Sequence, residues 1–317
     1  MPTTTNPAAQ LDAEFGSFPG LIAAWGAYQG EAPALNDGTV TLTWGEVADK
    51  VERIAARLQA DGLERGQAVA ILGTTCNAYA LIYLAAIRAG GCAAPLTTSA
   101  SPEQLAGMAK DSGAIHLFID RAKLTELGDF TLPVANQIVL DEELEAFMAA
   151  PGTKAAPFEP DDADPLNIIY SSGTTGIPKG IVHSHGMRWR QMTYRASLNY
   201  GADSRTLTST PLYSNTTMAV FLPTMYSGGY VSLMGKFDTE KWLDRAQTER
   251  ITHTMLVPVQ YRRLMQFERF NDYDLSAMKM KYCTSAPFPA DLKGEVLQRM
   301  PGGLIEIYGM TEGGVAC

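Results

Sequence analysis

Short apolar runs alternate along this chain with longer amphipathic stretches, and this alternation constrains the fold more than any other feature of the sequence. The run AVAILG at residues 68–73 is apolar throughout, which is typical of a strand covered on both faces. Before it, Val47, Val51, Ile54 and Leu58 recur at helical spacing. Helices that alternate with apolar strands predict a doubly wound α/β layer.

The alternation starts near the N-terminus and continues to the end of the chain. Asn36-Asp37-Gly38 predicts a hairpin turn, and a helix at 79–88, a strand at 92–96, a helix from Pro102 and a strand at 114–119 follow. In the second half we expect strands at 206–210, 230–234, 253–257, 279–283 and 304–308, and helices at 186–198, 215–227, 238–249, 259–269 and 289–299.

Residues 151–165, PGTKAAPFEPDDADP, interrupt this pattern with prolines and acidic residues. The carboxylates of Glu159, Asp161, Asp162 and Asp164 could form a metal site, but a proline-rich, irregular segment favours solvated linker charge. We therefore expect a first α/β subdomain with an N-terminal hairpin at residues 1–160 and a second α/β subdomain at residues 161–317.

Charge and composition exclude several classes of protein. Lys and Arg number 25 against 34 Asp and Glu, so a net charge of −9 argues against a nucleic-acid binder. The start, MPTTTNPAAQ, has no signal-peptide pattern, and the most apolar helical stretch, 78–87, is too short to span a bilayer. Four cysteines without C-x-x-C spacing indicate free thiols, so we expect a cytoplasmic protein. Its oligomeric state is not indicated.

The segment IYSSGTTGIPKG, residues 169–180, combines hydroxyls and glycines with one lysine. Backbone N–H groups and hydroxyls of such a loop can form a nest for an anion, and Lys179 adds a mobile positive charge. A Walker A loop does not fit, because Lys179 is followed by Gly180 and by Ile181-Val182, which predict a second strand. The segment therefore predicts a hairpin-like phosphate loop, although a generic glycine–serine turn remains the alternative.

IYSSGTTGIPKG closely resembles the signature loop of the acyl-adenylate-forming superfamily, which includes acyl-CoA synthetases. Three further segments are similar to family motifs in the same order: STPLYSN at 209–215, CTSAPFP at 283–289 and IYGMTEGG at 307–314. The resemblance implies an N-terminal domain of two doubly wound α/β subdomains. In the family a small β subdomain and a C-terminal lid domain follow; neither is in this sequence. We therefore expect the N-terminal portion of a longer enzyme, with impaired activity on its own.

The resemblance also implies an activity, an AMP-forming carboxylate–CoA ligase that uses ATP, Mg²⁺ and coenzyme A. The acid would form acyl-AMP and pyrophosphate, and then acyl-CoA. Lys179, Thr311 and Glu312 would be catalytic, with Thr311 on the α-phosphate and Glu312 as the metal ligand. The β- and γ-phosphates would bind Lys179 and the loop residues Ser171, Ser172, Gly173, Thr174, Thr175 and Gly176. Adenine would stack on Tyr308, beside Ser285, Ala286, Pro287 and Gly309. The substrate pocket would comprise Tyr213, Ser214, Met218, Ser285, Gly309 and Met310.

Three alternatives stay open. A peptide-synthetase-like adenylation domain is disfavoured, because residues 214–229 contain no acid to pair with an amino group. A catalytically inactive nucleotide-binding module is disfavoured by the intact Lys179, Thr311 and Glu312. The pair His183 and His185 could suggest zinc, but no third ligand is evident, which favours a structural role. The apolar segment 215–234 suits an aryl or medium aliphatic acid.

Overall fold

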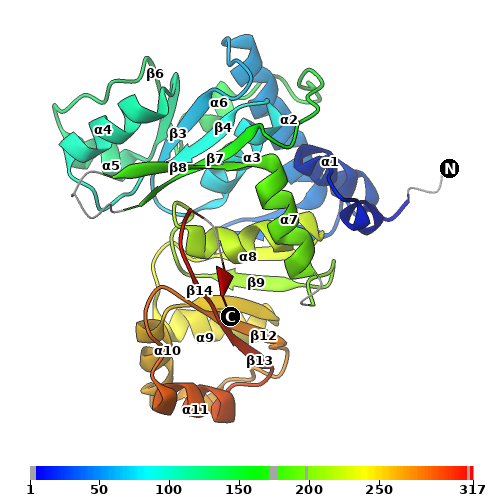
Figure 1. Cartoon of the computed structure of the whole chain (residues 1–317), viewed down its shortest axis with the longest axis vertical. Coiled ribbons are helices and arrows are strands. Elements are labelled where there is room, and N and C mark those ends of the chain that lie inside the picture. The colour runs from blue at the N-terminus through cyan, green and yellow to red at the C-terminus, as the bar shows by residue number, and fades with distance from the viewer. Residues whose placement is uncertain (1–4, 172–177, 197–198, 313–314, 317) are drawn as a thin grey trace. The chain divides into compact units, whose positions relative to one another are not determined.

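The computed structural model describes residues 5–171, 178–196, 199–312 and 315–316 (Figure 1). It divides into two compact units. The first comprises Met1–Ala32 and Leu42–Gln191, and the second comprises Pro33–Thr41 and Met192–Cys317. Each unit is built around a sheet of its own, so the two are described separately.

The first unit contains a six-stranded sheet in the order β6-β5-β3-β4-β7-β8. Its pairs are parallel except β7 with β8, which is antiparallel. The elements are η1 (Pro7–Asp12), α1 (Phe18–Tyr28), α2 (Trp44–Ala60), β3 (Ala68–Leu72), α3 (Asn77–Arg88), β4 (Cys92–Pro95), α4 (Pro102–Ser112), β5 (His116–Ile119), α5 (Arg121–Leu127), β6 (Asn136–Val139), α6 (Leu144–Phe147), β7 (Pro165–Ser171) and β8 (Lys179–Ser184), followed by α7 (His185–Ala196).

Helices cover both faces of this sheet. Strand β3 is buried at every position, and its alternate residues Ala68 and Leu72 share an apolar cluster with Leu105 of α4. The residues between them, such as Val69, point to the opposite face because side chains alternate along a strand. Helix α3 packs against β3 and β4, and its residues lie outside that cluster. The predicted doubly wound arrangement is therefore confirmed.

The second unit contains a seven-stranded sheet in the order β13-β12-β11-β9-β10-β1-β2. The register pairs of β1 and β9 to β13 are all parallel. The elements are β1 (Pro33–Asn36), β2 (Thr41–Thr43), β9 (Arg205–Thr208), α8 (Asn215–Tyr226), β10 (Tyr230–Leu233), α9 (Thr239–Thr248), β11 (His253–Leu256), α10 (Pro258–Met265), η2 (Phe270–Asp272), β12 (Met280–Cys283), α11 (Ala290–Arg299), β13 (Gly303–Glu306), β14 (Tyr308–Gly309) and β15 (Val315–Ala316) (Figure 1).

This sheet is also covered on both faces. Leu256 and Cys283, which end β11 and β12, pack in a cluster with Trp242 and other residues of α9, α10 and α11. The preceding residues, Met255 and Tyr282, belong to a separate cluster that includes residues of α8. Strand and helix positions expected for this half of the chain are confirmed, with ends that differ by a few residues.

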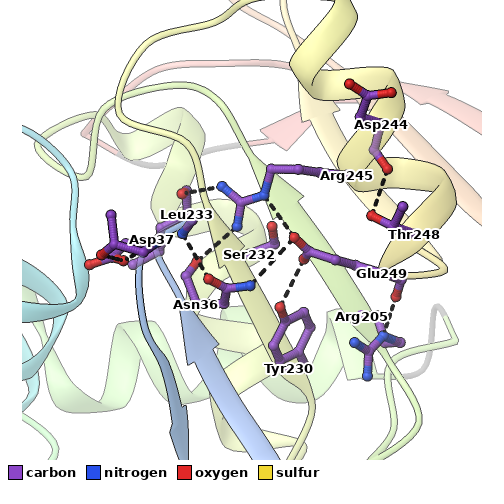
Figure 2. Close-up of polar contacts among 12 residues, drawn as sticks. Asn36, Asp37, Arg205, Tyr230, Ser232, Leu233, Asp244, Arg245, Thr248 and Glu249 are labelled. Atoms are coloured by element: carbon purple, nitrogen blue, oxygen red, sulfur yellow. Dashed lines mark hydrogen bonds and ion pairs between the residues drawn. The ribbon is translucent and has the colours of Figure 1, made fainter.

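Strand β1 comes from the N-terminal part of the chain but pairs with β10, with Leu35 opposite Val231. A polar network holds it there (Figure 2). The Arg245 guanidinium donates to the Asn36 carbonyl at 3.0 Å, to the Leu233 carbonyl at 2.8 Å and to the Glu249 carboxylate at 2.8 Å. The turn between β1 and β2 begins at Asn36, whose side chain accepts from the N–H of Gly38 at 2.7 Å, and Gly38 has a φ of +90°. The expected turn at Asn36-Asp37-Gly38 is confirmed.

The irregular segment 151–165 packs on the first unit. The carboxylate of Glu52 accepts from the N–H of Ala155 at 2.9 Å and from Arg88 at 2.7 Å. Arg88 in turn donates to the carbonyls of Ala155 and Ala156. The division between the units falls at residues 191 and 192, beyond the boundary expected at residue 160. The reason is that this proline-rich segment is held by a buried ion pair and the strands after it join the first sheet.

The acidic side chains of that segment form ion pairs with arginines. Asp161 and Asp164 bind Arg65, and Asp162 binds Arg190 at 2.6 Å. The interpretation as solvated charge is confirmed for Asp161 and Asp162, whose side chains are 83% and 54% exposed, whereas Asp164 is only 16% exposed and is held by Arg65.

Candidate functional site

The expected phosphate loop connects two antiparallel strands of the first unit. The register of β7 and β8 places Ser171 opposite Lys179, at the two ends of the loop. The prediction of a second strand beginning after the loop is confirmed. Lys179 is exposed, so its ammonium group is accessible to an anion. The remaining expected loop residues lie outside the described residues: Ser172, Gly173, Thr174, Thr175 and Gly176.

Helix α4 fixes the base of this hairpin. The Tyr170 hydroxyl lies 2.9 Å from the Met108 carbonyl and 3.0 Å from the Asp111 carboxylate. Burial, and then the charge of Asp111, raise the pKa of Tyr170. A Cβ atom at Gly180 would lie 2.8 Å from the Asp111 carboxylate. The glycine after Lys179 therefore allows β8 to pass close to α4.

The two histidines after the hairpin are packed in the first unit. Arg188 donates to Nδ1 of His183 at 2.8 Å and to the Asn167 side chain at 2.9 Å. His185 is fully buried beside Phe18, and burial lowers its pKa to about 4. Within the described ranges, no group of three or more His, Cys, Asp or Glu side chains is arranged to hold a metal ion. Both imidazoles are packed in the first unit: His183 is hydrogen-bonded to Arg188, whereas neither ring nitrogen of His185 has a hydrogen-bond partner among the described residues.

The second unit contains a cavity of about 150 Å³ where three distant segments of the chain meet. Helix α8 contributes its first turns, the turn after β12 contributes a second wall, and the residues after β13 contribute a third. Four predicted site residues line this cavity: Ser285, Gly309, Met310 and Thr311. The other lining residues are Asn215, Thr216, Ala219, Met255, Thr284 and Ile307.

The position of the cavity follows from the parallel sheet. Strands β11, β12 and β13 are neighbours and parallel, so their carboxyl ends lie at one edge. Met255 lies near the end of β11, while Thr284 and Ile307 directly follow β12 and β13. The Thr284 hydroxyl donates to the Ile307 carbonyl at 2.8 Å and ties these two strand ends together. In open α/β sheets, ligands bind outside the carboxyl ends of the strands.

Helix α8 begins at the cavity because the segment before it supplies a cap. The Ser214 hydroxyl accepts from the N–H of Thr216 at 3.2 Å. One turn further on, the Thr217 hydroxyl lies 2.7 Å from the Thr210 hydroxyl and donates to the Pro211 carbonyl. These bonds fix the side of α8 that carries Thr216 and Ala219 toward the cavity. Ser214, expected in the substrate pocket, therefore acts on α8 as its cap.

The remaining predicted residues of the second unit have different surroundings. Tyr308 is 80% exposed, in the short strand β14, which pairs with β15. Ala286, Pro287 and Glu312 are also exposed, and Tyr213 is half-buried. Met218 is only 1% exposed, within α8. Lys179 belongs to the first unit, whereas Thr311 and Glu312 belong to the second.

The sequence-based reasoning missed Asn215, Thr216 and Ala219. Asn215 ends the recognised STPLYSN segment, Thr216 and Ala219 follow it, and their spacing over one helical turn was the available signal. Thr284, which stands in the recognised CTSAPFP segment, was also not assigned to the site.

Every described residue that lines the cavity is uncharged. Ala219, Met255, Ile307 and Met310 supply apolar surface, while the threonines, Ser285 and Asn215 supply hydroxyls and an amide. This cavity is open to solvent, since Ser285, Gly309 and Met310 are exposed, and its volume is that of an interior cavity that admits one benzene ring. Such a site is suited to a neutral, ring-sized group held next to Thr311.

Across the ranges that the structure describes, every helix is too short or too polar to cross a membrane.

Comparison with known proteins identifies relatives of the whole chain. The family model for AMP-binding enzymes matches residues 22–317. A feruloyl-CoA synthase from Amycolatopsis sp is 32% identical over 290 residues, which are 89% of this chain and 56% of that protein. An indoleacetate–CoA ligase from Aromatoleum aromaticum is 31% identical, over 86% of this chain and 55% of its own. This chain spans about half the length of the curated relatives that it matches.

Solved structures show the same fold. The N-terminal domain of FACL13 from Mycobacterium tuberculosis matches with a TM-score of 0.84 and 22% identity, over 94% of this chain and 77% of that one. An o-succinylbenzoate coenzyme A synthetase from Bacillus subtilis, in complex with AMP, matches with a TM-score of 0.78 and 21% identity, over 92% and 74%. Because the family model covers nearly the whole chain, and relatives above 30% identity share the match, this chain belongs to the family of AMP-binding enzymes.

Proposed function

We propose that this chain forms the ATP-binding and acid-binding part of an AMP-forming carboxylate–CoA ligase. The reaction would join a carboxylic acid to the α-phosphate of ATP, release pyrophosphate, and then transfer the acyl group to coenzyme A. The cavity at the carboxyl edge of the second sheet carries this proposal, because Ser285, Gly309 and Thr311 line one space although they come from two separate motifs.

The chemistry requires alignment and charge stabilisation by the protein rather than a side-chain nucleophile. ATP supplies the electrophilic α-phosphorus and the pyrophosphate leaving group. Thr311 would donate its hydroxyl to an α-phosphate oxygen. Lys179, with Ser171 and the loop that follows it, would bind the other two phosphates, and Tyr308 would stack on adenine. Glu312 fits a Mg²⁺ ligand, because it is an exposed carboxylate and Mg²⁺ prefers oxygen.

The acid is proposed to be a neutral aryl acid. The relatives named for ferulate, indoleacetate and 4-coumarate all activate acids that carry an aromatic ring. The cavity has room for one ring, and its described lining residues are uncharged, which supports the same class for this chain. An amino acid substrate is disfavoured, since no carboxylate among the described lining residues can pair with its ammonium group.

A cytoplasmic location is part of the proposal. Cys92 and Cys283 are buried, unpaired thiols, which are typical of a reducing compartment. The net charge of −9 supports small-molecule partners rather than nucleic acid. In the resembling family, the lysine that reaches the reacting carboxylate belongs to the C-terminal domain. We therefore expect weak adenylation and no thioester formation by these 317 residues alone.

A sulfamate-linked benzoyl-adenosine, which mimics acyl-AMP, tests the proposal without requiring turnover. Calorimetric titration of the 317-residue chain should give a dissociation constant at least about tenfold below that of AMP. Thr311→Ala should weaken both ligands, and Glu312→Ala should remove the Mg²⁺ dependence of ATP binding. Equal affinity for the mimic and AMP would instead favour an inactive nucleotide-binding module. Tighter binding of an aminoacyl mimic would favour a peptide-synthetase-like domain.

A further inference from the structure

Ser285 has a backbone conformation that is unfavourable for serine. Its φ is +77°, in the left-handed region, where a residue with a Cβ atom is strained and glycine is not. The residue lies in the turn after β12 and lines the cavity. Strained backbone of this kind occurs where a side chain serves a function that a relaxed residue cannot provide.

The Ser285 hydroxyl reaches across the cavity to α8. It lies 2.9 Å from the Thr216 hydroxyl, and both residues line the cavity. Two hydroxyls that share one hydrogen bond retain one donor hydrogen and several acceptor lone pairs between them. The pair can therefore give and receive further hydrogen bonds from a group in the cavity.

The other polar groups nearby define what this pair can bind. The Thr284 hydroxyl is already used, since it donates to the Ile307 carbonyl. The side-chain oxygen of Asn215 is buried and accepts no hydrogen bond from any described residue. The remaining walls include Ala219 and Met255, and the lining residues that the structure describes are all uncharged. A complementary ligand group is therefore neutral and polar, attached to an apolar body.

We propose that the Thr216–Ser285 hydroxyl pair determines specificity by binding a hydroxyl substituent on the ring of the aryl acid. This inference rests on the proposed function, because it assigns the cavity to the acyl group. The pair would exchange hydrogen bonds with the substituent. Binding an unsubstituted ring would leave these groups unpaired, which costs affinity.

The test compares sulfamate-linked benzoyl-adenosine with its 2-, 3- and 4-hydroxybenzoyl forms on the 317-residue chain. We expect one hydroxy isomer to bind about fivefold tighter than the benzoyl compound, the effect of one neutral hydrogen bond. Ser285→Ala and Thr216→Val remove one hydroxyl each and should abolish this preference. If the pair only ties α8 to the turn, both variants will lose thermal stability and keep the preference, which overturns the inference.

Ser285→Gly adds a second readout. It removes the hydroxyl and relieves the backbone strain, so the preference should disappear while the melting temperature rises by about 2–4 °C. Arg250→Gly is the matched control, because Arg250 also has a positive φ, +50°, and lies outside the cavity lining. It should raise stability similarly and leave the preference unchanged.

Failure of every acyl mimic to bind tighter than AMP refutes the proposed function as well. Tight binding without any hydroxyl preference refutes this inference alone.

Discussion

The ion pair between Arg245 and Glu249 should be worth measurably more than an exposed pair at nearly the same distance. Both side chains are largely buried, at 15% and 14% exposure, and their atoms lie 2.8 Å apart (Figure 2). Arg245→Met keeps the aliphatic stem but removes the donors to Glu249, Leu233 and Asn36. Glu249→Gln keeps the shape and an acceptor for Tyr230 but removes the charge.

The expected magnitude follows from burial. Removing one partner of a fully buried ion pair costs about 3–5 kcal/mol, and residual exposure reduces this to about 2–3 kcal/mol for Arg245→Met. Two backbone carbonyls, of Leu233 and Asn36, lose their donor in the same variant. The double-mutant coupling energy between Arg245→Met and Glu249→Gln should be about 1–2 kcal/mol. This is the value of a hydrogen bond between charged groups that are partly exposed to solvent.

Native-state hydrogen exchange of the peptide that contains residues 33–41 is the appropriate assay. This peptide includes β1, which Arg245 holds through the Asn36 carbonyl, so its opening free energy reports the network directly. The control cycle uses Arg269→Met and Glu240→Gln, a pair at 3.0 Å whose side chains are 61% and 52% exposed. The control coupling should lie within measurement error. Equal coupling in the two cycles, or unchanged protection of the peptide in Arg245→Met, would refute the reasoning from burial.

Three further variants test other contacts. Lys281 is fully buried and donates to three backbone carbonyls at 2.6–3.2 Å, so Lys281→Met should lower the unfolding free energy by about 2–3 kcal/mol in urea titrations. His185, with its pKa lowered to about 4 by burial, is neutral when folded, whereas the unfolded chain binds its proton below its ordinary value of 6.5. Stability should therefore fall as pH drops from 6.5 toward 4, and His185→Phe should flatten that slope. The remaining slope would come from His116 and His253, whose pKa values are also lowered by burial. Glu52→Gln leaves Arg88 buried without its counter-charge and should cost about 3 kcal/mol, with faster tryptic cleavage near residue 154 as the readout. Cleavage at the wild-type rate would contradict this.

The fold was largely predictable because its strands are buried on both faces. The run 68–73 is apolar throughout, and a strand is the local structure that fits such a short run between helices. Helix α1, Phe18–Tyr28, was not predicted, since apolar residues surround it on most sides and leave little amphipathic pattern. The elements between residues 121 and 147 are short, and their sequence signals are correspondingly weak.

The domain boundary and part of the cavity lining depend on tertiary contacts, which the sequence pattern does not reveal. The boundary expected at residue 160 relied on proline content, but a buried pair of Glu52 and Arg88 attaches that segment to the first unit. The cavity was predictable for Ser285 and Thr311, which stand in recognised motifs, and not for Thr216, whose place depends on how α8 packs. That Lys179 and Thr311 bind phosphates of the same ATP molecule stays a prediction.

The pairing of β1 with β10 has a consequence for how the chain must be made. Leu35 leaves the ribosome long before Val231, its partner in the sheet, so this N-terminal segment stays without its neighbours while the intervening residues fold. A protein fragment that starts at residue 192 would form a sheet without β1, the strand beside β10. The unpaired backbone N–H and C=O groups of β10 could then pair with strands of other molecules. Supplying the missing nine-residue peptide in trans should restore that sheet, as in split-protein complementation.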